Sequence, residues 1–389
     1  MEHNCPRKNE FLSGKRINPK AIDRDYSISE LIDNNFNAYN AGRIKDACNL
    51  IVKEYSKKDV TVGMSLAGAL TPAGMGSSII PLIERGFVDW IVATGANMYH
   101  DMHHAFDLPL HEGSPNVNDC KLREVGVTRI YDVLFDCEDV LMETDRRLRN
   151  ILTKPEFQKE MGTQEFYHNL GKIMNECENE NKTGRVSILA SAYRKGVPVF
   201  TSSPGDSTIG MNIAGLELLS DKFRLKINPS IDINESTAIV LNAKKYENGK
   251  TGVILIGGGS PKNFMLQTEP QIQEILRIKE AGQDYFIQIT DARPDTGGLS
   301  GATPSEAVTW GKIDPEELSK TVIVYTDSTI ALPLITAYVM QNTAQKQHKR
   351  LYDRKDELMN QLKDSYFENF RKNAYEEMKK LEELLEQNH

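Results

Sequence analysis

A glutamate, a tryptophan and a lysine lie within seven residues of one another in the last third of the chain. The stretch from Gly297 to Ile313 reads GGLSGATPSEAVTWGKI and contains Glu306, Trp310 and Lys312. A lysine amine that is held against an aromatic ring and partly removed from water has a lowered pKa. A neutral amine of this kind attacks carbonyl or imine carbons. Lys312 is therefore a candidate nucleophile, although a lone lysine after a helix is more often a solvated charge.

The same stretch predicts the element that positions this lysine. Thr303 suits the N-cap of a short helix, and Pro304 suits its first position. Glu306 can complete a capping box with Thr303. Gly311 favours an early end, which places Lys312 in the turn after the helix. Three glycines before the helix let the backbone approach a ligand closely, namely Gly297, Gly298 and Gly301.

Apolar segments that alternate with helical patterns predict a buried sheet. The segments span residues 60–66, 88–93, 197–203, 251–256, 285–290 and 321–325. Such alternation is typical of an α/β fold with a parallel sheet and helices on both faces. Each segment is followed by small polar residues, and ligands of these sheets bind at the carboxyl ends of the strands. No GxGxxG pattern follows a strand, so glycine spacing alone does not indicate a dinucleotide site.

The rest of the chain is expected to be peripheral to this sheet. Helical spacing covers residues 27–57, and a charged helical section is expected between residues 138 and 182. After Pro333 the chain is expected to be helical to its end. Its apolar stripe from Leu351 to Leu385 predicts a long amphipathic helix that either packs on another subunit or lies on the surface. We divide the chain into an N-terminal arm (1–25), a catalytic domain (26–340) and a C-terminal helical extension (341–389).

Composition limits the classes of function. The chain has 389 residues, of which 39% are hydrophobic and 26% charged, and its net charge of −8 argues against a general nucleic-acid binder. Five scattered cysteines without a CxxC pair indicate reduced thiols and a cytoplasmic setting. No secretory h-region follows the start MEHNCPRKNEF, and no apolar run approaches the roughly 18 residues of a membrane span.

The run from Glu306 to Ile313, EAVTWGKI, resembles the deoxyhypusine synthases, whose corresponding run EAVSWGKI carries the covalent lysine. The resemblance extends over roughly residues 25–340. It implies a doubly wound, Rossmann-like, mostly parallel sheet, the cofactor NAD, and a homotetramer whose active sites are shared between subunits. It also implies that Lys312 forms the covalent intermediate, that Glu306 holds a substrate ammonium, and that Trp310 forms the aromatic wall.

The resemblance further implies a cofactor site at the carboxyl ends of the strands. The expected residues are Gly68, Ala69, Leu70, Thr71, Pro72, Thr94, Gly95, Ala96, Asp206, Gly258, Asp291, Ala292, Asp327 and Ser328. From the residues alone, the glycines at 257–259 fit a tight turn as well as a ligand cradle. Asp206 and Asp327 likewise fit helix N-caps as well as ribose ligands.

Four positions depart from the family pattern of the polyamine site. Leu299 and Met211 stand in place of aspartates, Asn263 in place of a histidine, and His100 in place of a glutamate. Fewer carboxylates weaken a site for a polycationic amine. The acids considered able to compensate are Asp101, Asp291, Asp295 and Glu306. The expected substrate-binding residues are His100, Asn263, Gly297, Gly298, Leu299 and Glu306.

The expected activity is transfer of a 4-aminobutyl group from a spermidine-like polyamine, through an imine on Lys312, to an acceptor amine. The acceptor is left open between a protein lysine, which gives a hypusine precursor, and a free diamine, which gives homospermidine. One alternative is a metal-dependent hydrolase that uses His100 and His104, but no distant third ligand is evident, so no metal is expected. Another is a catalytically inactive oligomeric homologue, against which the intact Glu306, Trp310 and Lys312 argue.

Overall fold

The computed structural model describes residues 12–370 and 374–387. At its centre lies a six-stranded sheet with the order β11-β10-β9-β1-β2-β7, in which every neighbouring pair is parallel. The strands are β1 (Val60–Leu66), β2 (Trp90–Ala93), β7 (Val199–Thr201), β9 (Lys250–Ile256), β10 (Tyr285–Thr290) and β11 (Thr321–Tyr325). All six predicted strands form, with ends within two residues of the predicted ones.

The strand order is that of a doubly wound sheet. The chain moves outward from β1 through β2 to β7, returns to β9 on the other side of β1, and continues through β10 to β11. The direction of winding therefore reverses between β1 and β9, where Leu66 pairs with Ile256. A crevice forms at such a switch point, outside the carboxyl ends of the strands. The predicted Rossmann-like, mostly parallel α/β fold is confirmed.

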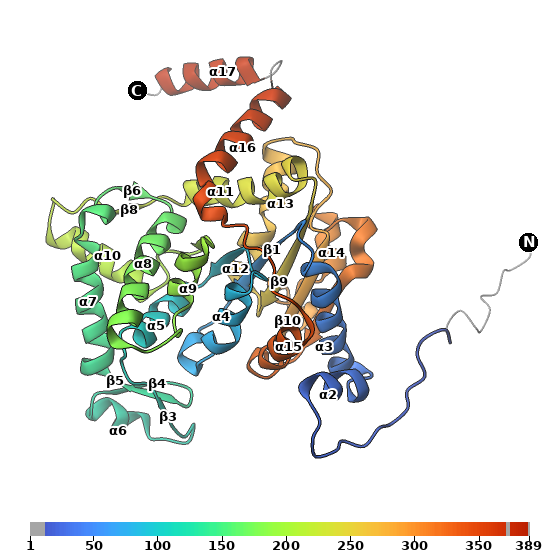
Figure 1. Cartoon of the computed structure of the whole chain (residues 1–389). Coiled ribbons are helices and arrows are strands. Elements are labelled where there is room, and N and C mark those ends of the chain that lie inside the picture. Colours follow the sequence, from blue (N-terminus) through green and yellow to red (C-terminus); the bar gives the residue numbers. More distant parts are fainter. Residues whose placement is uncertain (1–11, 371–373, 388–389) are drawn as a thin grey trace, which may run out of the picture.

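Helices cover both faces of the sheet, and each face has its own apolar core (Figure 1). In β9, Ile254 and Ile256 point into one core while Val253 and Leu255 point into the other, because strand residues alternate between faces. The first core is covered by α3 (Tyr39–Leu50), α4 (Gly76–Glu84), α9 (Ile188–Lys195) and α15 (Ser328–Asn342). The second is covered by α11 (Pro229–Leu241), α12 (Gly259–Leu266), α14 (Pro304–Thr309) and α16 (Lys355–Phe370).

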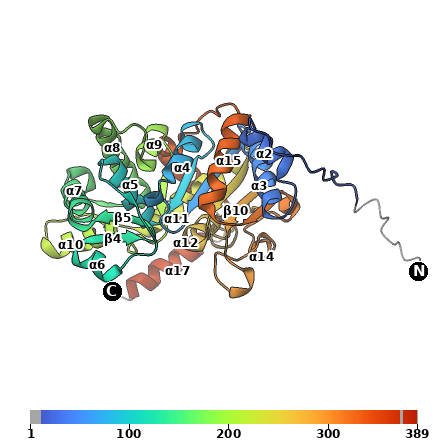
Figure 2. The same cartoon turned by 90° about the horizontal axis from the view of Figure 1, so that it is seen from below.

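A helical section flanks one side of the sheet, as predicted between residues 138 and 182. Figure 2 shows its helices grouped opposite α2 (Ile28–Asn35) and α3. The group contains α5 (Gly95–Ala105), α7 (Glu143–Leu152), α8 (Thr163–Asn181) and α10 (Thr208–Leu219). The sequence did not predict the small antiparallel sheet beside it, formed by β3 (His111–Glu112), β4 (Val127–Ile130) and β5 (Val133–Asp136).

The C-terminal part differs from the prediction of continuous helix after Pro333. Helix α15 ends at Asn342, and residues 343–350 form no helix. This stretch is held by contacts that a helix would not make: Lys346 N donates to Arg85 O at 2.9 Å, and Lys346 Nζ donates to Val60 O at 2.6 Å. Lys346 is buried there and also contacts Asp89 at 3.4 Å.

The predicted C-terminal stripe is divided between two helices, α16 and α17 (Ala374–Gln387). Leu358 and Leu362 are buried against α11 of the same chain, so the first part of the stripe does not pack on another subunit. Leu381 and Leu385 of α17 are exposed, and this helix lies away from the sheet in Figure 1. The side chains of Phe370 and Tyr375 lie outside the described residues, as do residues 1–11 of the predicted arm.

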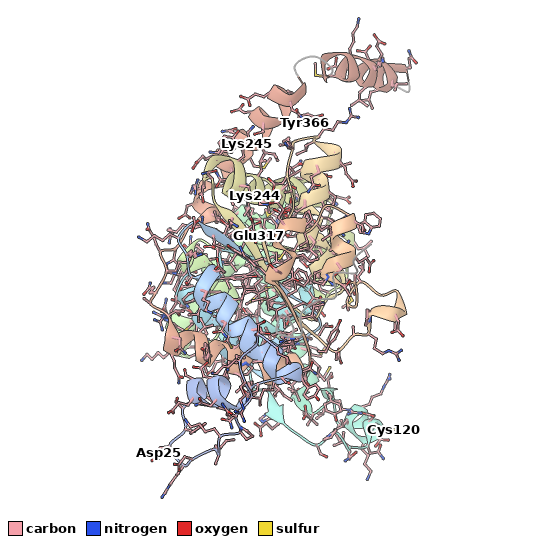
Figure 3. The ribbon with its side chains drawn as sticks, turned by 90° about the vertical axis from the view of Figure 1, so that its right-hand side faces the viewer. Asp25, Cys120, Lys244, Lys245, Glu317 and Tyr366 are labelled. Carbon is pink, nitrogen blue, oxygen red and sulfur yellow. The ribbon has the colours of Figure 1, made fainter. Side chains whose placement is uncertain are left out.

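Residues 12–25 of the arm carry no helix or strand and are exposed throughout. They extend away from the sheet in Figure 1, and Asp25 lies at the edge of the view in Figure 3. None of the described helices is both long and apolar enough to cross a membrane.

Candidate active site

The turn that carries Lys312 forms much as the sequence predicts. Thr303 caps α14, its hydroxyl accepting a hydrogen bond from Glu306 N at 3.2 Å, and Pro304 is the first helical residue. The helix ends at Thr309, and Gly311 adopts φ +66°. The capping box is only half formed, since the Glu306 carboxylate makes no bond to Thr303 N. That carboxylate is therefore available to a neighbouring cavity.

A cavity of about 310 Å³ lies between α12, α14 and the loop after β10. Its lining includes five of the predicted site residues: Asn263, Leu299, Glu306, Trp310 and Lys312. Lys312 Nζ donates to Asn263 Oδ1 at 3.0 Å and lies 5.8 Å from the centroid of the Trp310 ring. The structure thus brings the candidate nucleophile, the acid and the indole together around one cavity.

Burial and neighbouring carboxylates act on the pKa of Lys312 in opposite directions. Burial lowers the pKa of Lys312 below the ordinary lysine value, and the carboxylates of Glu306 and Glu274 partly oppose this shift. The lysine is only half-buried, and Trp310 is 58% exposed. The indole is thus largely exposed to solvent in the single chain, whereas the sequence predicted that it would be partly removed from water.

A second lysine in the cavity, Lys262, has a different environment. It is buried, its Nζ donates to Gln288 Oε1 at 3.0 Å and to Ala302 O at 2.7 Å, and burial lowers its pKa to about 8. The Gln288 amide donates in turn to Gly257 O at 2.9 Å and to Ser300 O at 2.8 Å. These bonds fasten the loop of residues 297–302 to the ends of β9 and β10. Lys262 is therefore tied to the framework, whereas Lys312 has a single amide partner.

Behind the Lys312 turn lies a buried polar cluster that the sequence did not reveal. Gln273 Nε2 donates to Gly311 O at 2.7 Å, and Gln283 N donates to Lys312 O at 3.0 Å. Glu269 is fully buried and accepts from both glutamine amides, at 3.5 Å from Gln273 and 3.0 Å from Gln283. Burial raises the pKa of Glu269 to about 8, and the nearby Lys244 (labelled in Figure 3) partly opposes this.

The two turns predicted to hold a cofactor at β1 and β2 are joined by one side chain, that of Asn97. Its Oδ1 accepts from Leu70 N at 2.7 Å, and its Nδ2 donates to Gly68 O at 3.1 Å. Thr94 Oγ1 also donates to Gly68 O, at 2.6 Å. Residues 68–72 and 94–96 therefore form one unit at the carboxyl end of β1 and β2. Asn97 was not among the predicted site residues, although it directly follows one of these turns.

The remaining cofactor candidates follow β7, β9, β10 and β11 at the same edge of the sheet. Asp327 caps α15, accepting from Thr329 N at 2.7 Å, so its carboxylate has a structural role. Asp206 does not cap α10, because Ser207 does, and no described residue pairs with its carboxylate. The other members, Gly258, Asp291, Ala292 and Ser328, lie directly after their strands.

The carboxyl edge of the sheet at the switch point carries two glycines with open surroundings. Gly68 and Gly259 flank it with φ values of +64° and +57°, and a Cβ on either residue would meet no atom within 4 Å. The backbone at these two glycines therefore borders open space, whereas a Cβ at Gly258 would overlap Ser300 and Gly259 N donates to Ser300 Oγ at 2.9 Å. None of the cofactor candidates lines the Lys312 cavity. Within one chain, the cofactor candidates and the residues that line the Lys312 cavity therefore do not border a common cavity.

Two predicted members of the amine site lie elsewhere. His100 does not line the Lys312 cavity; its ring packs against Tyr99 and His103 at 5.4 and 5.0 Å between centroids, and burial lowers its pKa to about 4. The expectation that Asp101 supplies negative charge to an amine site is wrong. Asp101 is fully buried and accepts from Ile188 N at 2.7 Å and from Leu189 N at 3.0 Å at the start of α9.

Met211, which stands in place of a family aspartate, and Asp295, which was considered able to compensate, are exposed outside that cavity. Met211 is 63% exposed on α10, and Asp295 pairs with Arg293 at 3.0 Å between Oδ1 and Nε. Asp291, Gly297 and Gly298 do not line the cavity either, although they belong to the loop that borders it.

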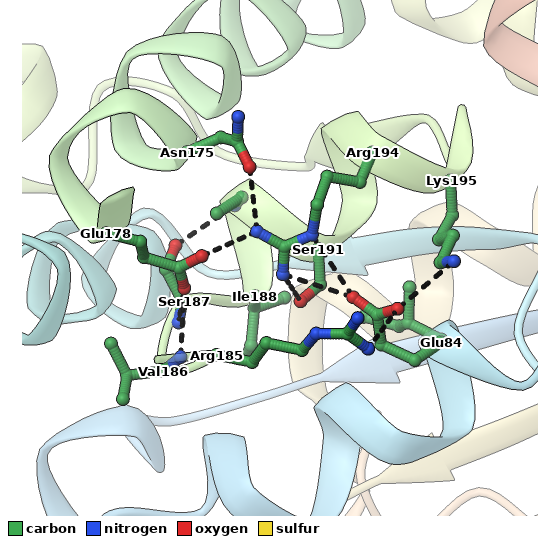
Figure 4. A network of polar contacts seen from close by, with 12 residues as sticks. Glu84, Asn175, Glu178, Arg185, Val186, Ser187, Ile188, Ser191, Arg194 and Lys195 are labelled. Carbon is green, nitrogen blue, oxygen red and sulfur yellow. Dashed lines mark hydrogen bonds and ion pairs between the residues drawn. The ribbon is translucent and has the colours of Figure 1, made fainter. Parts of the chain in front are cut away.

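An ionic network, shown in Figure 4, joins the helices α4, α8 and α9. Asp101 of α5 binds the start of α9, and Arg194 near the end of α9 pairs with Glu178 of α8 at 2.5 Å and with Glu84 of α4 at 3.1 Å. Glu84 also contacts Lys195 at 3.2 Å. The ion pairs thereby join α4, α8 and α9, and the hydrogen bonds of Asp101 link α5 to the start of α9.

The histidines considered as metal ligands have other partners. His104 Nε2 lies 3.0 Å from Thr71 O, within hydrogen-bonding distance of the first cofactor turn, and His100 is packed among aromatic rings. In the part of the chain that the structure describes, no three His, Cys, Asp or Glu side chains are grouped as metal ligands.

Comparison with known proteins gives a consistent result. Residues 31–339 match the family model of deoxyhypusine synthase. The chain is 54% identical over 354 residues to a deoxyhypusine synthase-like protein of Nostoc sp., with 91% of each chain covered. It is 38% identical over 330 residues to a Methanosarcina acetivorans protein assigned as deoxyhypusine synthase 2, with 82% of this chain and 88% of that protein covered.

A crystal structure from Entamoeba histolytica assigned as a deoxyhypusine synthase has a similar fold. The TM-score is 0.52 at 14% identity, covering 85% of this chain and 99% of the other. At this identity the likeness concerns the fold alone.

Proposed function

The chain belongs to the deoxyhypusine synthase family, and from this premise we propose that it is an NAD-dependent transferase of 4-aminobutyl groups. The donor is a spermidine-like polyamine, and the covalent intermediate is an imine on Lys312. The observation that carries this proposal is the cavity in which Lys312, its pKa lowered by burial, lies beside Glu306 and Trp310.

The chemistry that bound NAD supplies is reversible hydride removal from an amine carbon, which turns the donor into an electrophilic imine and afterwards saturates the product. The neutral Nζ of Lys312 attacks the imine carbon and forms a new C–N bond. The bond from this carbon to the donor nitrogen breaks, and 1,3-diaminopropane leaves with the two hydrogens of the lysine amine. An acceptor amine then displaces Nζ by the same exchange, which regenerates Lys312.

Neighbouring side chains have distinct parts in this sequence. The Asn263 amide oxygen, 3.0 Å from Nζ, orients the lysine. The carboxylate of Glu306 would hold an ammonium group of the donor by a charge-assisted hydrogen bond. The face of Trp310 would shield the iminium and attract its positive charge.

The separation of the two residue sets bears on assembly. Since the cofactor candidates and the Lys312 cavity do not share a lining within one chain, we propose a homotetramer in which one subunit's cofactor edge meets another's Lys312. The catalytic domain of this proposal spans residues 26–340. Lys312 would then react beside a cofactor that is bound mainly by a neighbouring subunit.

A second candidate differs only in the acceptor. Leu299 lines the cavity and is 50% exposed, and Asn263 is neutral, so the cavity has few carboxylates for a long polycation or a protein loop rich in lysine. This favours a free diamine as acceptor, with homospermidine as the product. A comparison of products formed from spermidine with 1,4-diaminobutane and with a lysine-bearing acceptor protein distinguishes the two.

Borohydride trapping tests the covalent step. Incubation with NAD and spermidine labelled in its butyl carbons, followed by borohydride, should leave label on Lys312. The Lys312→Ala variant should lose the adduct while its NAD affinity stays unchanged, and Lys279→Ala, which alters an exposed lysine, should behave like the unaltered enzyme. Label on Lys262, or normal turnover by Lys312→Ala, would refute the assignment.

A further inference from the structure

A second cavity, of about 390 Å³, lies on the opposite side of the ridge that bounds the Lys312 cavity. The ridge runs from α12 through residues 267–270 to η6 (Gln271–Ile275), and the second cavity lies between this ridge and α11. Four residues line both cavities, namely Asn263, Gln267, Pro270 and Glu274. Because Asn263 bonds Lys312 Nζ, the second cavity begins one side chain away from the reacting nitrogen.

The two cavities differ in charge. The lining of the Lys312 cavity holds two lysines and two glutamates, Lys262 and Lys312 with Glu274 and Glu306. In the lining of the second cavity, Glu274 is the one charged side chain among the described residues. Its volume is within the range of small-molecule sites.

Most of the second cavity's other polar groups carry oxygen. Hydroxyls come from Ser202, Ser236, Thr237 and Ser260, and an amide comes from Gln271. Glu274 is exposed at the edge of this cavity, and a carboxylate beside a lining of neutral hydroxyl oxygens suits an ammonium group, which donates three hydrogen bonds and accepts none. No described residue pairs with the Glu274 carboxylate, although that carboxylate acts on Lys312 and raises its pKa.

We propose that the second cavity binds the acceptor, a free aliphatic diamine, with Glu274 holding one ammonium while the other nitrogen reaches the imine carbon on Lys312. This inference rests on the proposed transferase function and adds the location and class of its second substrate. The donor's ammonium already has Glu306 within the Lys312 cavity. A monoamine lacks the group that Glu274 binds, and is therefore a poor acceptor.

Two variants test this site, and one of them separates it from the donor site. Gln271 lines the second cavity but not the first, so Gln271→Lys introduces a cation into the second cavity alone. Glu274→Gln removes the carboxylate at nearly constant shape. Glu316→Gln serves as a matched control, because Glu316 is exposed and lines neither cavity. Each variant is assayed for trapped adduct on Lys312 and for transfer of the label to 1,4-diaminobutane and to 1-aminobutane.

Gln271→Lys should form the adduct as the unaltered enzyme does, whereas Glu274→Gln also removes a carboxylate that raises the pKa of Lys312 and is therefore judged only on the transfer step that follows trapping. The KM of both variants for 1,4-diaminobutane should rise by roughly tenfold, as expected for the loss of one charge-assisted hydrogen bond. The preference for 1,4-diaminobutane over 1-aminobutane should fall, while Glu316→Gln changes neither quantity. An unchanged KM in both variants would overturn the inference, as would a loss of adduct in Gln271→Lys that matches its loss of transfer.

Direct binding keeps the two proposals distinguishable. Calorimetric titration of 1,4-diaminobutane into the full chain requires no turnover, and the affinity should fall in Gln271→Lys. If the unaltered chain forms no adduct but shows this loss of affinity, the transferase proposal fails and the ammonium site stands. If adduct forms but affinity is the same in both proteins, the second cavity is not the acceptor site.

Discussion

Replacement of Gly311 by alanine tests whether the backbone at Lys312 is held in place by its buried supports. Gly311 has φ +66°, and a left-handed conformation costs an L-residue about 1–2 kcal/mol. A Cβ there would also overlap the side-chain amide of Gln273, which donates to Gly311 O at 2.7 Å. Moving that flexible amide aside removes its hydrogen bond, at about 1 kcal/mol. The free energy of unfolding should therefore fall by roughly 2–3 kcal/mol.

Gly126→Ala supplies the matched control for this experiment. Gly126 has φ +72°, but a Cβ there would meet no atom within 4 Å. This variant should lose only the conformational part, about 1–2 kcal/mol in urea unfolding. Only Gly311→Ala should also slow formation of the borohydride-trapped adduct, because Lys312 directly follows the displaced carbonyl. Equal losses of stability together with equal rates of adduct formation would show that Gln273 does not position the lysine.

Three further outcomes follow from the described contacts. Asn97→Ala should weaken NAD binding while leaving Lys312 available to an added aldehyde, and unchanged affinity in calorimetry would remove Asn97 from the cofactor site. Glu306→Gln should shift the acidic limb of the pH–rate profile for adduct formation to lower pH, because Glu306 raises the pKa of Lys312; a shift to higher pH would contradict this. The folded-state pKa of Glu269, about 8, exceeds the ordinary glutamate value, so the folded state binds the extra proton and stability should decrease as pH rises from about 4.5 to 8. Glu269→Gln should flatten this decrease in urea titrations at several pH values, and an unaltered slope would count against a protonated Glu269.

Features that depend on nearby residues were predictable from the sequence. The six strands are short apolar segments bounded by turn residues, and each formed within two residues of its expected ends. The Lys312 turn was equally local, since a threonine cap, a proline and a glycine within nine residues set the length of α14. The half of the capping box that did not form is the bond from Thr303 N to the Glu306 carboxylate. In the folded chain this carboxylate lines a cavity with charged side chains, which the local sequence does not reveal.

Features that depend on distant partners were not predictable. Asp101 looked like an acid beside histidines, but its partner is the start of α9, nearly ninety residues along the chain. The glutamine and glutamate cluster behind Gly311 lies in a segment without a recognisable motif. The amphipathic spacing after residue 350 indicated a helix correctly but could not specify which surface it covers, since α11 offers a partner within the same chain.

The buried ammonium of Lys346 constrains how the protein can be shortened. A fragment ending at residue 340 would retain Asp89, fully enclosed and bonded to Val62 N at 2.9 Å, but would lose the cation 3.4 Å away. Removing one partner of a buried pair costs about 3–5 kcal/mol. Shortened versions of this protein should therefore keep the chain past Lys346. The segment of residues 343–350, which follows α15, covers the N-terminal end of β1.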